Sequence, residues 1–352
     1  MLVFLADEPT AEREQEGMTQ RVKWVDEQFR DVPRVILSIS PRRNLHRRQL
    51  IRSSVLTVEE VNLFLHFPRI LYLALHSNLI YVHSCFHALR ALPLYLLGLP
   101  IITDMHGVVP EELQLSGKPW ASRLISVVEK IVVKRSAAMV FVTDAMQRHF
   151  ERKYSLRNDS SSYIIPILTR GGTSVGRSTR DPKLVIYAGG LHVWQRVDHM
   201  LDAVEQTRGD FKFLFLTGEA ERLRSKLNER RLTEVDVDSV PKARVFEYYE
   251  RASLGFVLRE DSVINRVACP TKLVEYMWAG VIPIVEQPII GDFRERGYKY
   301  VLVDDFVNGH MPQPSELESM REHNLRVAME LEQLSLDQFM RMRVKYVRTG
   351  VK

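Results

Sequence analysis

Length, composition and charge exclude several classes of protein. The chain has 352 residues, of which 45% are hydrophobic and 26% are charged, so it can bury a large core and divide into two domains. The net charge of +5 does not by itself indicate a nucleic-acid partner, and none is expected. The two cysteines, Cys85 and Cys269, exclude a disulfide scaffold and fit a reducing cytoplasm. No apolar run is long enough to span a bilayer.

The first half of the chain alternates predicted strands and helices. Residues 2–6 are apolar and turn acidic at Asp7, which is typical of a first strand and not of a secretory leader. Alternation of this kind predicts a parallel, doubly wound sheet. The expected strands are 2–6, 34–39, 79–82, 100–104, 138–142 and 163–166, and the expected helices are 18–29, 68–77, 88–98, 120–135 and 145–153.

The predicted helix 120–135 carries apolar residues at helical spacing. Such a repeat is typical of the stripe that a helix buries against a sheet. The residues of this expected buried stripe are Leu124, Val127, Val128, Ile131 and Val132.

Residues 169–182, TRGGTSVGRSTRDP, interrupt the pattern with three glycines and several small polar residues. This composition is typical of a mobile linker. We therefore expect an N-terminal domain over 1–168, a C-terminal domain over 183–335, and a last helix, 336–352, that packs back toward the N-terminal domain. In the second half the expected strands are 183–188, 211–217, 233–237, 254–258, 281–285 and 300–303, and the expected helices are 196–207, 220–229, 242–251, 270–279 and 292–296.

The most informative segment is CPTKLVEYMWAGVIP, residues 269–283. Pro270 fits the first turn of a helix, because proline presets φ and lacks an N–H that is not needed there. The helix dipole disfavours a cation in that turn, so Lys272 indicates a nearby anion, which the free N–H groups of the turn would also bind. Glu275 can accept hydrogen bonds from the hydroxyls of a ribose. The alternative is an ordinary amphipathic helix with a surface Lys–Glu pair.

The same segment resembles the donor-binding signature of family 4-type GT-B glycosyltransferases, Pro-x-Lys-x-x-Glu-Tyr-x-x-x-Gly-x-Pro. The resemblance implies two Rossmann-like doubly wound α/β domains that face a central cleft, closed by a C-terminal helical segment. It also implies that Glu275 binds the nucleotide ribose and that Thr271 and Lys272 lie near the diphosphate or the sugar. The matching residues are Pro270, Lys272, Glu275, Tyr276, Gly280 and Pro283.

Other parts of the second half extend this resemblance. Gly189 and Gly190 follow a predicted strand, as in the glycine turn that opens the second domain of the group, and glycines let the backbone approach a phosphate. Arg196 can clamp a diphosphate through bidentate bonds. Arg259 and Asn265 follow the strand 254–258 and are expected to contact sugar or phosphate. The alternatives are a plain βα turn and a charged exposed loop.

In the first half, residues 100–112, PIITDMHGVVPEE, resemble the family's strand followed by a His-Gly loop. His106 comes just past the carboxyl end of a strand, where open α/β sheets place ligands, so we expect it in the active site. Gly17 resembles the glycine loop that approaches the donor phosphate or the acceptor, and Arg21 follows on the same helix. Candidate acceptor-side carboxylates are Asp104 and Glu111.

The chain departs from the family pattern in ways that indicate a divergent branch. Val267 stands where many members carry a second glutamate. Leu191 and Gln195 stand where the usual phosphate-binding Arg and Lys are expected, with Arg196 as the nearest substitute. The Asp-x-Asp pair 236–238 lies away from the place of a metal–diphosphate site. We therefore expect no metal and no cofactor, with the nucleotide-sugar as a co-substrate.

Basic residues crowd one short stretch of the first half. Such a stretch can contact an anionic membrane or a phosphorylated acceptor, and each basic residue near an anionic bilayer contributes about 1 kcal/mol. The alternative is a solvated loop. The basic residues are Arg42, Arg43, Arg47, Arg48 and Arg52.

These features predict a retaining, metal-independent glycosyltransferase that moves a sugar from a nucleotide-sugar to a glycan or lipid-linked acceptor. The expected setting is surface polysaccharide biosynthesis of the bacterial type, in the cytoplasm or on the inner membrane face. Positive charge from Lys272, Arg196 and the helix start would stabilise the leaving diphosphate, with His106 also in the catalytic site. Two alternatives stay open: a nucleotide-sugar epimerase or hydrolase on the same fold, and a non-catalytic GT-B-like binding protein.

Overall fold

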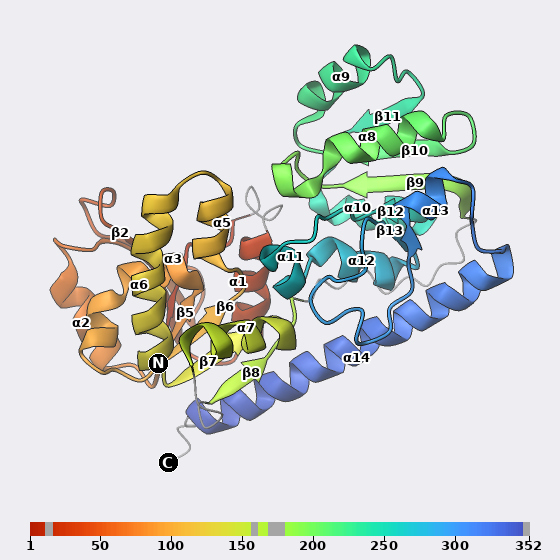
Figure 1. Ribbon diagram of the computed structural model, residues 1–352. Coiled ribbons are helices and arrows are strands. Elements are labelled where there is room, and N and C mark those ends of the chain that lie inside the picture. Colours follow the sequence, from red (N-terminus) through yellow and green to blue (C-terminus); the bar gives the residue numbers. More distant parts are fainter. Residues whose placement is uncertain (11–16, 156–160, 168–179, 348–352) are drawn as a thin grey trace. The chain divides into compact units, whose positions relative to one another are not determined.

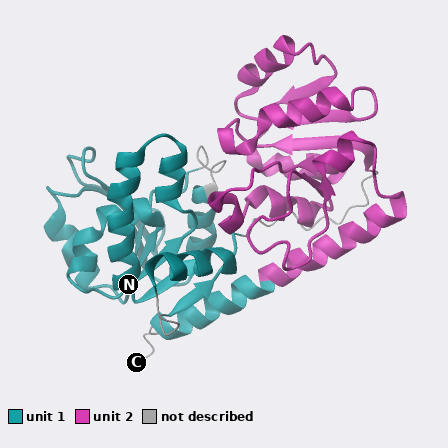
Figure 2. Cartoon of the chain, viewed as in Figure 1, with its two compact units in different colours: residues 1–167, 333–352 teal, residues 168–332 magenta. Residues whose placement is uncertain are grey.

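The computed structural model describes residues 1–10, 17–155, 161–167 and 180–347. The chain divides into two compact units (Figure 2): residues 1–167 with 333–352 form unit 1, and residues 168–332 form unit 2. The predicted linker 169–182 falls mostly outside the described residues, and the first strand of unit 2 begins at Asp181.

Unit 1 is an α/β unit built on one large sheet (Figure 1). Its strands are β1 (Leu2–Leu5), β2 (Arg34–Ser40), β3 (Arg48–Ile51), β4 (Leu56–Asn62), β5 (Leu79–His83), β6 (Ile101–Met105), β7 (Ala138–Phe141) and β8 (Ser162–Ile164). Its helices are α1 (Gly17–Glu27), α2 (Phe67–Leu75), α3 (Ser84–Arg90), α4 (Leu92–Leu96), α5 (Val109–Leu115), α6 (Pro119–Arg135) and α7 (Asp144–Tyr154).

The sheet of unit 1 has eight strands in the order β3-β4-β2-β1-β5-β6-β7-β8. All neighbouring strands run parallel except β3, which is antiparallel to β4. The central strands are buried along their whole length, as parallel strands covered by helices must be. Phe4 of β1, Val25 of α1 and Phe339 belong to one apolar core cluster.

β3 and β4 were not predicted from the sequence. Glu59 lies at the centre of β4 and is fully buried, so its carboxylate breaks the apolar pattern that predicts a strand. Arg69 of α2 compensates this charge, with Nη2 at 2.5 Å from Glu59 Oε1. A buried charge is tolerated when it is paired and hydrogen-bonded, and here the partner lies on another element.

The basic stretch 42–52 is partly neutralised by acidic neighbours. Arg48 Nη1 lies 3.6 Å from Glu60 Oε2, and Arg52 Nε lies 2.6 Å from Glu8 Oε1. These ion pairs offset part of the positive charge on which the predicted membrane contact of this stretch depends.

Unit 2 is a second α/β unit with a fully parallel sheet. Its strands are β9 (Asp181–Ala188), β10 (Lys212–Leu216), β11 (Val235–Asp238), β12 (Ala252–Phe256), β13 (Ile282–Val285) and β14 (Val301–Leu302). Its helices are α8 (Val197–Gln206), α9 (Ala220–Glu229), α10 (Lys242–Arg251), α11 (Val263–Val267), α12 (Thr271–Ala279) and α13 (Val303–Val307), with a 3₁₀ turn at Val193–Gln195. The order β11-β10-β9-β12-β13-β14 reverses direction between β9 and β12, which makes this point the switch point of a doubly wound sheet.

The predicted helix 292–296 is wrong. The segment forms hydrogen-bonded turns, with Arg296 N donating to Asp292 O at 3.0 Å. Gly291 and Gly297 bracket it with φ of 48° and 78°, and these left-handed residues limit the segment to turns. The predicted strand 300–303 is reduced to β14, because α13 begins at Val303.

Helix α14 (Pro314–Tyr346) has 33 residues and belongs to both units, which divide at Glu332 and Gln333. In unit 2, the Asn324 side chain accepts from Lys299 N at 2.7 Å and donates to Lys299 O at 2.8 Å. In unit 1, Arg343 Nη1 donates to Gln28 O at 2.9 Å. Among the described helices, none is long and apolar enough to cross a membrane. The prediction of two parallel, doubly wound α/β domains is confirmed.

Candidate functional site

The start of α12 differs by one residue from the prediction. Pro270 is the N-cap, with φ −69° and ψ 121°, and the helix begins at Thr271. The Pro270 carbonyl accepts from Leu273 N at 3.1 Å and from Val274 N at 3.3 Å. The first N–H groups of a helix have no carbonyl of their own helix to bind, so those of Thr271 and Lys272 are available to a ligand at the helix start.

The end of α12 is capped by cations. Gly280 takes the left-handed C-cap conformation with φ 71°. Arg180 donates to Ala279 O, and Arg321 Nε donates to Gly280 O at 3.1 Å. Positive groups stabilise the negative end of a helix dipole. Lys272 stands at the opposite, positive end, where the dipole opposes it.

Lys272 is a buried cation without a carboxylate partner. The residue is 8% exposed, and its Nζ donates to Gln195 Oε1 at 3.3 Å and lies 3.6 Å from the centre of the Tyr187 ring. Among the described residues, no carboxylate lies within ion-pair distance of this ammonium. Burial, followed by the nearby charge of Arg259, holds the pKa of Lys272 well below its usual value.

Because Gly189 has no side chain, the ammonium of Lys272 can lie close to the backbone at the end of β9. A Cβ at Gly189 would lie 2.9 Å from Lys272 Nζ and 3.1 Å from Tyr187 Oη, so a side chain there would displace the ammonium. The hydroxyl of Tyr187 donates to Gly190 O at 2.6 Å and fixes the turn. The two glycines therefore belong to the same site as Lys272.

Arg259 is the second cation of this site. Its Nη1 donates to Asn265 Oδ1 at 2.8 Å, and Asn265 Nδ2 donates to Glu260 O at 2.9 Å. Burial lowers the pKa of Arg259 to about 10, and its buried Nε has no hydrogen-bond partner among the described residues. Asn265 is 1% exposed and uses its amide to hold Arg259, so the structure makes it a positioning residue.

These groups meet at the carboxyl edge of the sheet of unit 2. Gly189 follows β9 and Arg259 follows β12, which are neighbouring strands at the switch point. Lys272 brings the start of α12 to the same edge, because its ammonium reaches Gly189. Two cations, a helix start and a glycine turn form a site for an anion with several charged oxygens.

Glu275 lies one turn further along α12 and is 4% exposed. Its Oε1 binds Lys242 of α10, and its Oε2 accepts from Tyr249 Oη at 3.1 Å. The alternative of a surface Lys–Glu pair is therefore wrong, since Lys272 and Glu275 are both buried. A carboxylate has about four acceptor positions, so Glu275 keeps capacity for ribose hydroxyls, and its ribose role stays a prediction.

Arg196 does not join the two cations. It takes the left-handed N-cap position of α8 with φ 54°. Its Nη2 lies 3.0 Å from Glu286 Oε1, and its Nε donates to Glu286 Oε2 at 3.2 Å. This bidentate pair already compensates the charge of Arg196. The residue that faces Lys272 is its neighbour Gln195, and the structure therefore gives no contact that supports Arg196 as a phosphate clamp.

In unit 1, Arg21 and Asp104 form an ion pair in the core. Both side chains are 0% exposed, with Arg21 Nε at 2.8 Å from Asp104 Oδ2, and Tyr81 Oη donates to the same carboxylate at 2.8 Å. Burial alone would raise the pKa of Asp104, but Arg21, His106 and His83 together outweigh it and hold that pKa well below the usual range. Arg21 and Asp104 therefore compensate each other's charge in the core, and their predicted contacts with phosphate or acceptor stay predictions.

Two histidines flank Asp104 at the carboxyl edge of the sheet of unit 1. His106 Nδ1 lies 3.7 Å from Asp104 Oδ1, and His83 Nδ1 lies 3.6 Å from Asp104 Oδ2. The ring nitrogens of both are buried without a hydrogen-bond partner among the described residues, and burial lowers the pKa of His83 to about 3. Buried polar atoms without partners mark a place for a ligand or water. The sequence analysis missed His83, although it follows a predicted strand in the same manner as His106.

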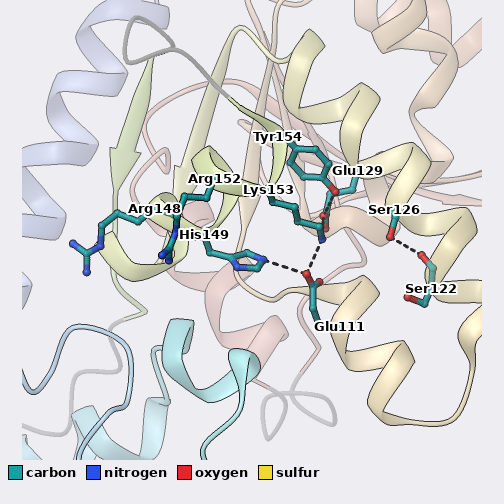
Figure 3. Close-up of polar contacts among 9 residues, drawn as sticks. All are labelled: Glu111, Ser122, Ser126, Glu129, Arg148, His149, Arg152, Lys153 and Tyr154. Atoms are coloured by element: carbon teal, nitrogen blue, oxygen red, sulfur yellow. Dashed lines mark hydrogen bonds and ion pairs between the residues drawn. The ribbon is translucent and has the colours of Figure 1, made fainter.

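Glu111 belongs to a separate polar network (Figure 3). Its Oε1 accepts from His149 Nε2 at 3.1 Å and from Lys153 Nζ at 2.8 Å. Lys153 Nζ also donates to the buried Glu129 at 2.7 Å, and Tyr154 donates to the same oxygen. Glu111 therefore ties α5 to α6 and α7 through Lys153, and its role as an acceptor carboxylate stays a prediction.

Other predicted features have a plainer outcome. Gly17 begins α1, while the acidic loop before it, 11–16, lies outside the described residues. Cys85 and Cys269 are buried thiols. In the part of the chain that the structure describes, no group of three or more His, Cys, Asp and Glu side chains is arranged to hold a metal ion.

Solved structures match the chain along its full length. A sucrose-phosphate synthase from Thermosynechococcus elongatus matches with a TM-score of 0.72 and 12% identity, over 99% of this chain and 100% of that chain. An α,α-trehalose-phosphate synthase (UDP-forming) from Burkholderia vietnamiensis matches with a TM-score of 0.68 and 14% identity, over 100% and 98%. A trehalose-6-phosphate protein from E. coli, bound with UDP-2-fluoro glucose, has a TM-score of 0.69 and 10% identity, over 99% of each chain.

No family model and no curated protein matches the sequence. At identities this low, the likeness to solved structures establishes the fold alone. These structural neighbours are GT-B glycosyltransferases, and the two parallel-sheet units of this chain confirm the predicted GT-B architecture.

Proposed function

We propose that the chain is a glycosyltransferase that takes its sugar from a nucleoside-diphosphate sugar. The observation that carries this proposal is the pair of cations at the carboxyl edge of unit 2, the buried Lys272 and the half-buried Arg259. A buried ammonium costs free energy unless an anion compensates it, and a diphosphate supplies the missing charge. The neighbours described as UDP-forming and as bound with UDP-2-fluoro glucose support a donor of this class.

The donor would bind with its diphosphate against the start of α12. There the N–H groups of Thr271 and Lys272 and the Lys272 ammonium face the same phosphate oxygens, and Gly189 leaves the backbone open to them. Arg259, held by Asn265, adds a second positive charge. Glu275, one turn along the helix, would accept the hydroxyls of the ribose.

Transfer breaks the bond between the sugar's anomeric carbon and a phosphate oxygen, and forms a bond from that carbon to an acceptor oxygen. Negative charge collects on the departing diphosphate. Lys272 is buried at the start of α12 and Arg259 is held by Asn265, so both cations stabilise this charge without reorganising. In the retaining route that the resemblance implies, the acceptor attacks on the leaving-group face and the departing phosphate takes its proton, so the protein supplies no nucleophile.

Retention, metal independence and the acceptor are finer parts of the same proposal. Retention predicts a product with the anomeric configuration of the donor, read by NMR, and metal independence predicts full activity in EDTA. The proposed acceptor is a glycan or a lipid-linked glycan of bacterial-type surface polysaccharide synthesis. His106, whose ring nitrogens have no described partner, is proposed to contact a substrate.

A thermal-shift panel of UDP-, GDP-, dTDP- and CMP-sugars tests the donor site. One nucleotide class should raise the melting temperature of the wild type and leave Glu275→Ala unshifted. Glu221→Ala is the matched control, since the Glu221 side chain is 91% exposed, and it should shift like the wild type. If a modified free sugar formed in the absence of any acceptor, the result would favour the epimerase or hydrolase alternative over sugar transfer. No binding of any nucleotide would overturn the proposal in favour of a non-catalytic protein.

A further inference from the structure

Helix α6 has two apolar faces, and only one of them is buried. The predicted buried stripe splits: Val128 and Val132 are 4% and 0% exposed, whereas Leu124 and Val127 are 62% and 59% exposed. At 3.6 residues per turn, Leu124 and Val127 share their face with Trp120, which is 79% exposed. A soluble helix normally presents polar residues on this side.

The inner face of α6 is fixed, so the helix cannot turn to bury its outer face. Figure 3 shows Glu129 of α6 directed toward Lys153 and Tyr154 of α7. Glu129 is 0% exposed and accepts from Lys153 Nζ at 2.7 Å. Rotation of α6 would break this buried pair, which is costly.

The outer face of α6 carries positive charge and lacks negative charge. In residues 116–135 the single acidic residue is Glu129, which lies on the inner face. The guanidinium of Arg123 lies 5.3 Å from the centre of the Trp120 ring. Within the described residues no ion pair involves the basic residues of this segment, in contrast to Arg48 and Arg52 of the stretch 42–52. These basic residues are Lys118, Arg123, Lys130, Lys134 and Arg135.

We propose that this outer face binds the surface of an anionic lipid bilayer. The outer face is defined by its three apolar residues, Trp120, Leu124 and Val127, together with the exposed basic residues of α6, Arg123, Lys130, Lys134 and Arg135. Amphipathic helices that lie in a bilayer interface combine Trp and Leu on one side with flanking Lys and Arg, which contact the phosphates of the lipids. The contact predicted for the stretch 42–52 stays a separate prediction.

The charge pattern favours a bilayer over a second copy of the chain. In a symmetric dimer through this face, the cations of one copy would meet the same cations of the other, because a two-fold interface pairs a patch with itself. Like charges brought together in this way oppose association. An anionic bilayer presents the opposite charge along with an apolar layer for Trp120 and Leu124.

Vesicle co-sedimentation tests this proposal without any nucleotide-sugar, so its result is independent of the proposed transfer reaction. The probes are vesicles of phosphatidylcholine with phosphatidylserine, and vesicles of phosphatidylcholine alone. The test variant is L124E/V127E. The matched control is M340E/V344E on α14, where Met340 and Val344 are 53% and 78% exposed, because it adds the same charge to another exposed apolar pair.

The wild type and M340E/V344E should bind the phosphatidylserine vesicles and lose binding as salt rises, while L124E/V127E binds about tenfold more weakly or less. Three results would overturn the proposal: no vesicle binding by the wild type, equal loss in both variants, or a wild-type dimer in sedimentation velocity that L124E/V127E abolishes. The last result would assign the face to a second copy. Circular dichroism and melting temperature confirm that each variant is folded.

Discussion

Two clusters of buried charge, one in each unit, have opposite character. In unit 1, Arg21 and Asp104 are both 0% exposed and neutralise each other at 2.8 Å. In unit 2, Lys272 and Arg259 are two cations whose described contacts include no carboxylate. A balanced buried pair stabilises the fold of the ligand-free protein only while both partners remain, whereas an unbalanced pair is costly until a ligand arrives. A buried charge therefore indicates a binding site when no residue of opposite charge compensates it.

The largest effect is expected when one partner of the balanced pair is removed. Arg21→Met leaves the Asp104 carboxylate buried and unpaired, which should lower the free energy of unfolding by about 3–5 kcal/mol. Urea unfolding at neutral pH measures it. Arg52→Met is the control: its exposed pair with Glu8 should matter by less than about 1 kcal/mol. Equal effects of the two changes would contradict the structural role of Arg21.

Removing a cation from the unbalanced pair should have the reverse pattern. Lys272→Met should leave the unliganded melting temperature unchanged or higher, because a buried ammonium without an anion is lost. Turnover should fall by about a hundredfold to a thousandfold, the usual cost of removing one stabilising donor at a developing negative charge. Thermal unfolding and a nucleoside-diphosphate release assay measure the two quantities. A large drop in melting temperature with little loss of turnover would show that Lys272 is structural.

Donor binding should also be accompanied by proton uptake at Lys272. The pKa of Lys272 is held well below its usual value in the ligand-free protein, and a bound diphosphate would raise it. Between these two pKa values the complex holds more protons than the free protein, so donor affinity should fall as pH rises through that window. Calorimetric titration in buffers of different ionisation enthalpy should detect uptake of protons by the wild type and none by Lys272→Met. Proton release, or uptake that the variant retains, would contradict this assignment.

The smallest effect is expected at Arg196. Its charge is compensated by Glu286 at 3.0 Å, so Arg196→Gln should change donor affinity by less than about threefold, in the range of exposed ion pairs. The same calorimetric titration measures it. A loss as large as that of Lys272→Met would restore Arg196 as a ligand of the diphosphate.

The alternation of strands and helices predicted most of the fold, because local apolar runs and turn residues carry that information. β4 was not predicted because Glu59 interrupts its apolar pattern. The partner that allows Glu59 to be buried, Arg69, lies ten residues away on α2. The helix 120–135 was predicted, but the side of it that is buried was not. Which side is buried depends on what the rest of the chain packs against the helix.

The candidate site was predictable where a local motif carries it. The segment 269–283 located Lys272 and Glu275, and the glycine turn located Gly189. What a cation binds is set by the tertiary structure: Arg21 meets Asp104, which lies 83 residues away, and Arg196 meets Glu286, 90 residues away. In the sequence, Arg21 and Lys272 look alike, because each is a basic residue near the start of a predicted helix. Only the partners that the tertiary structure gives them separate a structural cation from a candidate ligand-binding one.

The position of bound UDP is best determined by a crystal structure of the complex. We expect the diphosphate to lie within hydrogen-bonding distance of Lys272 Nζ and of the N–H groups at the start of α12, with the ribose against Glu275. Nucleotide bound elsewhere in the chain, with Lys272 still held by Gln195 and Tyr187 alone, would contradict it.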